Sequence, residues 1–163
     1  MINLIVFSTI SILFSLTSPA LAGDYVVIAE EATVDATAEA AWAKVGDYCA
    51  IEIWMGLKCE ITSGNGGTGT VRLLNGEIEE VIVGSTANSH TYMQTKGSMK
   101  TTGYHGTVSV SANKDGKSST LRWIAVYDQS ALPDDATRAA TREQFGGFYQ
   151  NGVASMKTLA EGE

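Results

Sequence analysis

The run GTVRLLNGEIEEVIVG, residues 69–84, decides the fold because it joins two β-prone segments through Asn75-Gly76. Asn-Gly between two such segments is a strong signal for a tight hairpin turn. The same period-two pattern, interrupted by turns rich in Gly, Asn and Asp, extends over residues 58–128. We expect its strands at residues 58–63, 69–74, 77–84, 90–96, 104–112 and 120–128. Six or seven consecutive strands at this short spacing predict one antiparallel meander.

A strand and a helix are predicted before the meander. Residues 25–33 are rich in β-forming residues and predict a first strand. Ala38, Ala41 and Val45 then recur at the spacing of one helix face, which predicts a helix. Residues 50–55 are compatible with a second short helix, but their apolar period alone does not distinguish it from a strand.

A long helix is predicted at the C-terminal end of the chain. Asp134-Asp135 supplies the negative charge that is favoured at a helix N-terminus. The residues that follow include an apolar face with helical spacing: Phe145, Phe148, Gly152, Met156 and Leu159. Gly146, Gly147 and Gly152 interrupt this helix, and each costs about 1 kcal/mol against Ala in an exposed helix. We therefore expect close packing at these three glycines.

An apolar run precedes the predicted domain. Residues 2–16 carry no charge and are followed by Pro19 and then Ala20-Leu21-Ala22. This order is typical of a secretory signal peptide, residues 1–22, removed from a domain at 23–163. The run is shorter than the roughly 20 residues of a membrane-spanning helix, so a retained anchor is the less favoured alternative. We expect an exported protein, periplasmic or secreted, with no stable membrane insertion after signal cleavage.

Cys49 and Cys59 are the two cysteines of the chain. An oxidising compartment permits a disulfide between them, and we expect one. Two separately buried thiols are the alternative. Neither cysteine has a His or another obvious base beside it in the sequence, which argues against a nucleophilic cysteine.

Composition excludes several classes of function. The 163 residues favour a single domain. With 11 Lys and Arg against 18 Asp and Glu, the net charge is −7, which argues against nucleic-acid binding through a basic face. Two Cys and two His are too few for the usual cysteine or histidine zinc sites. We expect neither a metal nor another cofactor.

Four short motifs stand in a characteristic order along the chain: ATAEAAW at 36–42, GTVR at 69–72, EEV at 79–81 and FYQNGV at 148–153. Together with the order of the predicted elements, they resemble the START/birch-pollen-allergen superfamily, called SRPBCC, and within it the polyketide cyclase/dehydrase-like group. The resemblance covers nearly all of the chain after residue 22. It implies an α+β helix-grip fold, in which a curved antiparallel sheet of six to seven strands wraps around a long C-terminal helix. Two short helices follow the first strand.

The resemblance also implies an apolar cavity, but fold alone does not settle function. The favoured hypothesis is an exported binding protein for a small hydrophobic or lipid-like molecule, held between the sheet and the C-terminal helix. The alternative is a polyketide cyclase/dehydrase-like enzyme acting on a carbonyl-containing hydrophobic substrate. Glu79 would then be the general acid/base, and Tyr104 or Lys96 would polarise the carbonyl. A third hypothesis is an interaction protein whose aromatic core leaves no cavity.

Successive side chains of a strand point to opposite faces of the sheet, and this alternation predicts which residues face the cavity. In the strand at 77–84, Glu79 shares a face with Val81 and Val83, which places its carboxylate inside. The structural alternative is that Glu79 pairs with Lys96 or lies at the rim of the sheet. The predicted ligand-binding residues are Trp54, Glu79, Val81, Tyr92, Tyr104, Val108, Trp123, Phe145, Phe148 and Tyr149.

Overall fold

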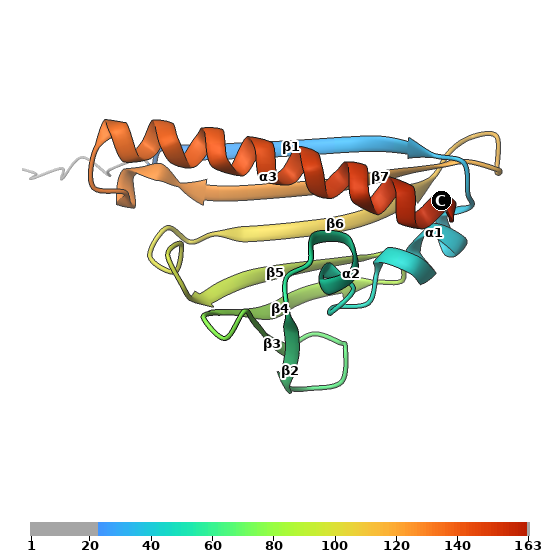
Figure 1. The fold of residues 1–163 in the computed structure, drawn as a ribbon, viewed down its shortest axis with the longest axis horizontal. Coiled ribbons are helices and arrows are strands. Elements are labelled where there is room, and N and C mark those ends of the chain that lie inside the picture. The colour runs from blue at the N-terminus through green and yellow to red at the C-terminus, as the bar shows by residue number, and fades with distance from the viewer. Residues whose placement is uncertain (1–22, 163) are drawn as a thin grey trace, which may run out of the picture.

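A computed structural model describes residues 23–162, so the predicted signal peptide lies outside the described residues (Figure 1). The elements in chain order are β1 (Tyr25–Val34), α1 (Ala38–Val45), α2 (Ile51–Met55), β2 (Cys59–Ser63), β3 (Val71–Leu74), β4 (Ile78–Thr86), β5 (Ser89–Lys96), β6 (His105–Ala112), β7 (Ser119–Asp128), the short 3-10 helix η1 (Gln129–Ala131) and α3 (Asp135–Glu161). This order confirms the predicted α+β helix-grip fold.

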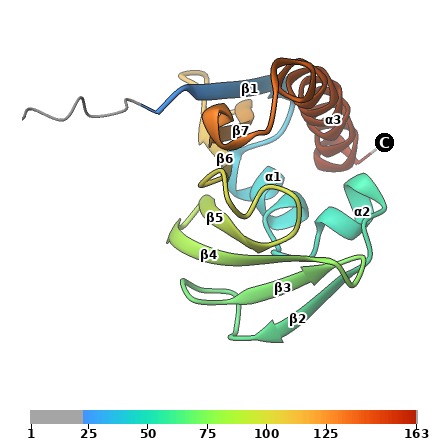
Figure 2. The same cartoon turned by 90° about the vertical axis from the view of Figure 1, so that its left-hand side faces the viewer.

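The strands form one antiparallel sheet in the order β1-β7-β6-β5-β4-β3-β2. Strands β2 to β7 pair with their neighbours in the chain, as the predicted meander requires, and β1 pairs with β7. Figure 2 shows the sheet curving around the side on which α1, α2 and α3 lie. The pairing of β4 with β5 shifts register at two points, and such irregularities bend a strand and increase its twist.

Helix α3 lies along the concave side of the sheet (Figure 1). Asp134 caps its N-terminus by accepting a hydrogen bond of 2.7 Å from the backbone N–H of Thr137. Its buried face carries Tyr149, Val153 and Met156, which belong to the hydrophobic core. Among residues 23–162, no helix has both the length and the apolar character needed to cross a membrane.

The three glycines of α3 differ in their surroundings. A Cβ atom at Gly152 would lie 2.3 Å from a ring carbon of Trp123, so the missing side chain lets the indole pack against the helix backbone. Close packing is thus confirmed at this position. Beside Gly146 and Gly147 no such atom lies within 4 Å of the corresponding position. The prediction of close packing is wrong for these two glycines, because open space adjoins them.

Cys49 and Cys59 form the predicted disulfide, with their Cα atoms 5.4 Å apart. Cys49 lies just before α2 and Cys59 begins β2, so the bridge closes a loop that contains α2. Two side chains of this loop, Ile51 and Leu57, line the concave side of the molecule. The disulfide therefore ties down one wall of the space that the sheet encloses.

Candidate ligand-binding cavity

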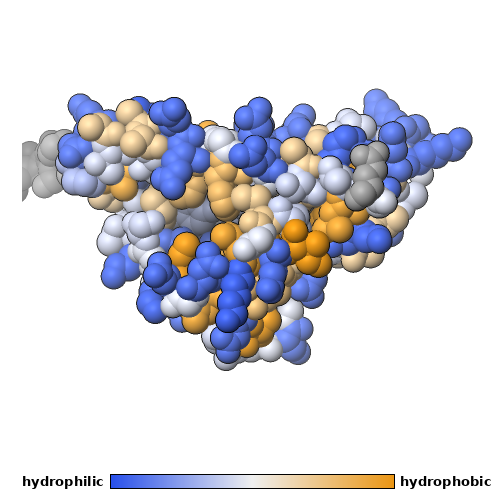
Figure 3. All heavy atoms as spheres, in the orientation of Figure 1, coloured by the Kyte–Doolittle hydropathy of each residue, from blue (hydrophilic) through white to orange (hydrophobic). Residues whose placement is uncertain are grey.

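A cavity of about 470 Å³ lies between the concave face of the sheet and the first half of α3. This volume falls within the range of small-molecule sites in proteins. Aliphatic side chains and a methionine from the sheet, the loops and the disulfide-closed segment form much of its wall: Ile51, Leu57, Leu74, Ile78, Met99 and Leu132. Figure 3 shows apolar residues gathered below α3 on this side of the molecule.

A buried ion pair stands in this apolar wall. Arg72 on β3 and Glu80 on β4 are direct cross-strand partners. The Nε and Nη2 atoms of Arg72 donate to Oε2 of Glu80 at 2.9 and 2.7 Å. Burial raises the pKa of the Glu80 carboxyl, and the adjacent guanidinium opposes this rise. The pair places two charged side chains in the cavity wall, and their opposite charges cancel.

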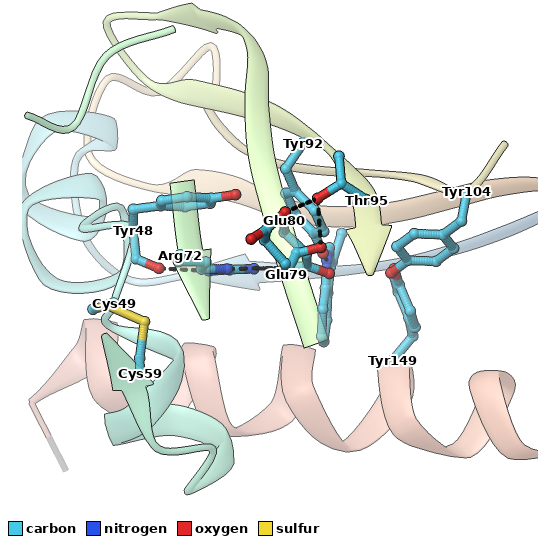
Figure 4. A network of polar contacts seen from close by, with 11 residues as sticks. Tyr48, Cys49, Cys59, Arg72, Glu79, Glu80, Tyr92, Thr95, Tyr104 and Tyr149 are labelled. Carbon is cyan, nitrogen blue, oxygen red and sulfur yellow. Dashed lines mark hydrogen bonds and ion pairs between the residues drawn. A yellow bond between two sulfur atoms is a disulfide. The ribbon is translucent and has the colours of Figure 1, made fainter. Parts of the chain in front are cut away.

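The guanidinium of Arg72 is held by several neighbouring groups (Figure 4). Its Nη1 donates to the backbone carbonyl of Tyr48 at 2.5 Å, so each of its three nitrogens has an acceptor. Its central carbon lies 4.1 Å from the ring centroid of Tyr48 and 4.8 Å from that of Tyr92. Cations over aromatic faces are stabilised by the ring quadrupole. Arg72 is thus fixed by its neighbours and holds Glu80 in place.

Aromatic side chains form the end of the cavity next to α3. Trp123 Nε1 donates to the hydroxyl of Tyr92 at 2.9 Å, and the hydroxyls of Tyr104 and Tyr149 lie 2.5 Å apart. Burial raises the pKa of both Tyr104 and Tyr149 well above the usual tyrosine value, so both are neutral near pH 7. Phe145 stacks on Tyr104 with ring centroids 5.7 Å apart. These contacts give the cavity a rigid aromatic wall.

His90 is buried beside the Arg72 guanidinium but does not line the cavity. Its ring lies 5.5 Å from that of Trp42 and 5.3 Å from that of Tyr48, measured between centroids. Its pKa is lowered to about 4, mainly by burial and also by the positive charge of Arg72, while Asp47 opposes the shift. Within residues 23–162, no three His, Cys, Asp or Glu side chains gather in an arrangement that could hold a metal ion.

The residues predicted to bind ligand fall into three groups. Half of them line the cavity: Tyr92, Tyr104, Trp123, Phe145 and Phe148. Trp54, Val108 and Tyr149 are buried in the core but are not part of the cavity wall. Glu79 and Val81 lie on the opposite face of β4 from the buried Glu80 and Ile82. The ligand-binding role of the cavity-lining residues remains a prediction.

The inward face predicted for β4 is wrong. Glu79 is half-buried on the outer face, where its carboxylate accepts a hydrogen bond of 2.7 Å from the hydroxyl of Thr95. Its neighbour Glu80 lines the cavity instead. Lys96 pairs with Glu79 in the strand register but is exposed, so neither of these two catalytic candidates reaches the cavity. Tyr104, the third candidate, does line it.

Several polar residues of the cavity were missed by sequence reasoning. Arg72, Glu80 and Gln94 lie opposite one another on three adjacent strands. One available signal was Arg72 in the GTVR motif, because an arginine that is buried needs a paired carboxylate. Thr137 and Thr141 on α3 were also missed, since their place depends on how the helix lies over the sheet.

Comparison with solved structures finds the same fold in several proteins. A protein of Nitrosospira multiformis is 19% identical with a TM-score of 0.66, covering 82% of this chain and 95% of that one. Protein XoxI from Bacillus cereus is also 19% identical, with a TM-score of 0.66 over 81% and 93% of the two chains. Ara h 8.0201 is 15% identical, with a TM-score of 0.57 over 81% and 97%.

At these identities the structures show a shared fold alone, and comparison with curated proteins finds no match. The sequence model of a family described as "Polyketide cyclase / dehydrase and lipid transport" matches residues 25–161. That span includes every strand and helix of the structure. The chain therefore belongs to the polyketide cyclase/dehydrase and lipid transport family, within the START/birch-pollen-allergen superfamily.

Proposed function

We propose that this protein is an exported binding protein for a small hydrophobic or lipid-like molecule, held in the cavity between the sheet and α3. The observation that carries the proposal is the cavity of about 470 Å³, lined mainly by aliphatic and aromatic side chains. Burial of apolar surface contributes about 25 cal/mol per Å², so such a wall favours an apolar ligand. The membership in a family that includes lipid transport supports the same function.

The enzyme alternative receives less support from the geometry. It required the carboxylate of Glu79 in the cavity as general acid/base, and that carboxylate lies on the outer face of the sheet. The carboxylate that does line the cavity, Glu80, is engaged by Arg72 through two hydrogen bonds. The third hypothesis, a filled aromatic core, is disfavoured by the cavity itself.

A pair of variants on α3 tests ligand binding in the cavity. Thr141 lines the cavity, whereas its neighbour Ala140 is exposed and does not line it. We expect Thr141→Trp to fill part of the cavity and to weaken binding of the neutral fluorescent probe N-phenyl-1-naphthylamine at least tenfold. Ala140→Trp should leave the affinity unchanged. Equal affinities in both variants, or no binding by the wild-type protein, would contradict the proposal.

Export is the second part of the proposal, and the Cys49–Cys59 disulfide supports it because disulfides persist in oxidising compartments. The test expresses the full chain in a bacterial host and separates the compartments. We expect a processed protein that begins at Gly23 outside the cytoplasm, with its disulfide intact by mass spectrometry. Unprocessed chain that stays in the cytoplasm or the membrane fraction would contradict export without affecting the cavity.

A further inference from the structure

We infer that Glu80 and Gln94 together bind the polar group at one end of the ligand. They select a neutral group that has both a hydrogen-bond donor and an acceptor, such as a carboxamide. This inference rests on the proposed ligand-binding function. The two residues face each other across β4 and β5, where they are partners in the strand register. Both line the cavity and both are more than nine-tenths buried.

Glu80 offers the ligand a hydrogen-bond acceptor. Both hydrogen bonds from Arg72 end on its Oε2 atom. Its other carboxylate oxygen, Oε1, has no hydrogen-bond partner among residues 23–162. A carboxylate oxygen that borders a largely apolar cavity without a partner is costly, so a donor from a bound molecule would be stabilised there.

Gln94 offers a donor beside that acceptor. Its Oε1 atom accepts the backbone N–H of Met99 at 2.7 Å. Because the backbone N–H can only donate, this bond fixes the orientation of the side-chain amide and leaves its NH₂ group at the other end. The NH₂ group has no acceptor within the described part of the chain. Facing residues in a sheet have Cβ atoms about 4.5–5.5 Å apart, so one polar end of a ligand can meet both groups.

The charges around this pair disfavour an anionic ligand. Arg72 is the sole cation among the cavity-lining residues of the described chain. All three of its nitrogens donate to protein acceptors, and the rings of Tyr48 and Tyr92 lie against it. A ligand carboxylate would meet the Glu80 carboxylate without any free cation to offset the repulsion.

An ammonium group is also a poor match for this pair. The charge of Glu80 is already balanced by Arg72 at 2.7 Å. The NH₂ group of Gln94 needs an acceptor, and an ammonium group has none. A primary carboxamide satisfies both sides, because its N–H donates to Glu80 and its carbonyl accepts from Gln94.

The experiment compares decanamide, decanoate and decylammonium at pH 7.5, each by displacement of N-phenyl-1-naphthylamine from the wild-type protein. These probes share an alkyl chain and differ in the polar end. We expect decanamide to bind at least tenfold more tightly than either charged probe. Equal affinities, or tighter binding of decanoate, would overturn the inference while leaving the binding function intact. Failure of every probe to bind would count against the function itself.

A variant of Gln94 tests whether this residue causes the preference for decanamide over decanoate. Gln94→Met keeps a side chain of similar length but removes the donor, so the ratio of decanamide to decanoate affinity should fall toward one. Glu79→Gln, on the outer face of the adjacent strand, is the matched control and should keep the wild-type ratio. Because Gln94→Met also loses the bond to Met99, Gln94→Glu serves as a second variant that retains an acceptor for that N–H. Its added carboxylate repels decanoate as well, so here the expected result is a loss of decanamide affinity alone. An unchanged ratio in folded Gln94→Met, or an unchanged decanamide affinity in folded Gln94→Glu, would refute the assignment.

Discussion

Arg72 and Glu80 form an ion pair across β3 and β4, with 2.7 Å between Nη2 and Oε2, inside the otherwise largely apolar wall of a cavity. The side chains of both residues are at most 5% exposed. Taking two charges out of water is expensive, and further hydrogen bonds to the pair help to offset that cost. The carbonyl of Tyr48 provides that third contact for Arg72. The pair therefore links the disulfide-closed segment next to Tyr48 with strands β3 and β4.

Removing one partner of this pair is expected to be costly. Glu80→Gln leaves the Arg72 charge buried without its carboxylate, and we expect a loss of about 3–5 kcal/mol in the free energy of unfolding. The control is Glu79→Gln, which changes the same residue type on the outer face and should alter stability by less than about 0.5 kcal/mol. Urea denaturation of both variants with the disulfide intact measures the difference. Similar losses in the two variants would contradict the assigned positions.

The contrast between these two glutamates shows where sequence reasoning succeeds and where it stops. Alternation correctly separates the residues of β4 into two faces, but both faces carry apolar residues: Val81 and Val83 on one, Ile78 and Ile82 on the other. The sequence therefore does not say which face is buried. The answer comes from the pairing of Glu80 with Arg72, and that pairing depends on the register of two strands.

Other features were predictable because local signals and tertiary structure agree. The Asn75-Gly76 turn lies between β3 and β4 as its sequence requires, and both residues have the positive φ that such turns need. On β7, Trp123 and Tyr127 face the core as alternation predicts. On α3, the positions of Phe145 and Phe148 in the cavity wall followed from the apolar face of the helix. The position of Thr141 did not, because the helix period does not say how the helix lies over the sheet.

The disulfide is expected to stabilise the fold and the cavity wall together. Closing a loop of this length contributes roughly 2.5–3 kcal/mol in the chain-entropy model. We expect the double variant Cys49→Ser/Cys59→Ser to lose about that much stability and to bind N-phenyl-1-naphthylamine more weakly, because Ile51 and Leu57 lie in the closed segment. Thermal unfolding and probe titration check the two effects. A variant with wild-type affinity would show that this segment does not need the bridge to hold the wall.

Two Gly→Ala substitutions in α3 should change stability in opposite directions. At Gly152 the new Cβ would lie 2.3 Å from the ring of Trp123, and such overpacking typically costs about 1–3 kcal/mol. At Gly147 no such atom lies within 4 Å, so Gly147→Ala should stabilise the helix by up to about 1 kcal/mol. Chemical denaturation of the two variants compares the same substitution in one helix. Equal signs would contradict the packing described at Gly152.

His90 should make the protein less stable in mild acid. Its pKa is about 4 in the folded protein and about 6.5 in the unfolded chain, so the unfolded state binds more protons between these values. The contribution of His90 is fully present above pH 6.5, falls as the pH is lowered, and levels off below about pH 4. The total loss is roughly 3 kcal/mol, at about 1.4 kcal/mol per pKa unit.

The variant His90→Phe isolates this contribution, because it keeps an aromatic ring between Trp42 and Tyr48 but does not titrate. Urea unfolding of both proteins at pH values from 4 to 8 gives the difference in their free energies of unfolding. We expect the wild-type protein to lose stability relative to His90→Phe as the pH falls from 6.5 to 4, and the difference to be constant above pH 7. A difference that does not vary with pH would mean that His90 is protonated equally in the folded and unfolded states, contrary to its burial beside Arg72.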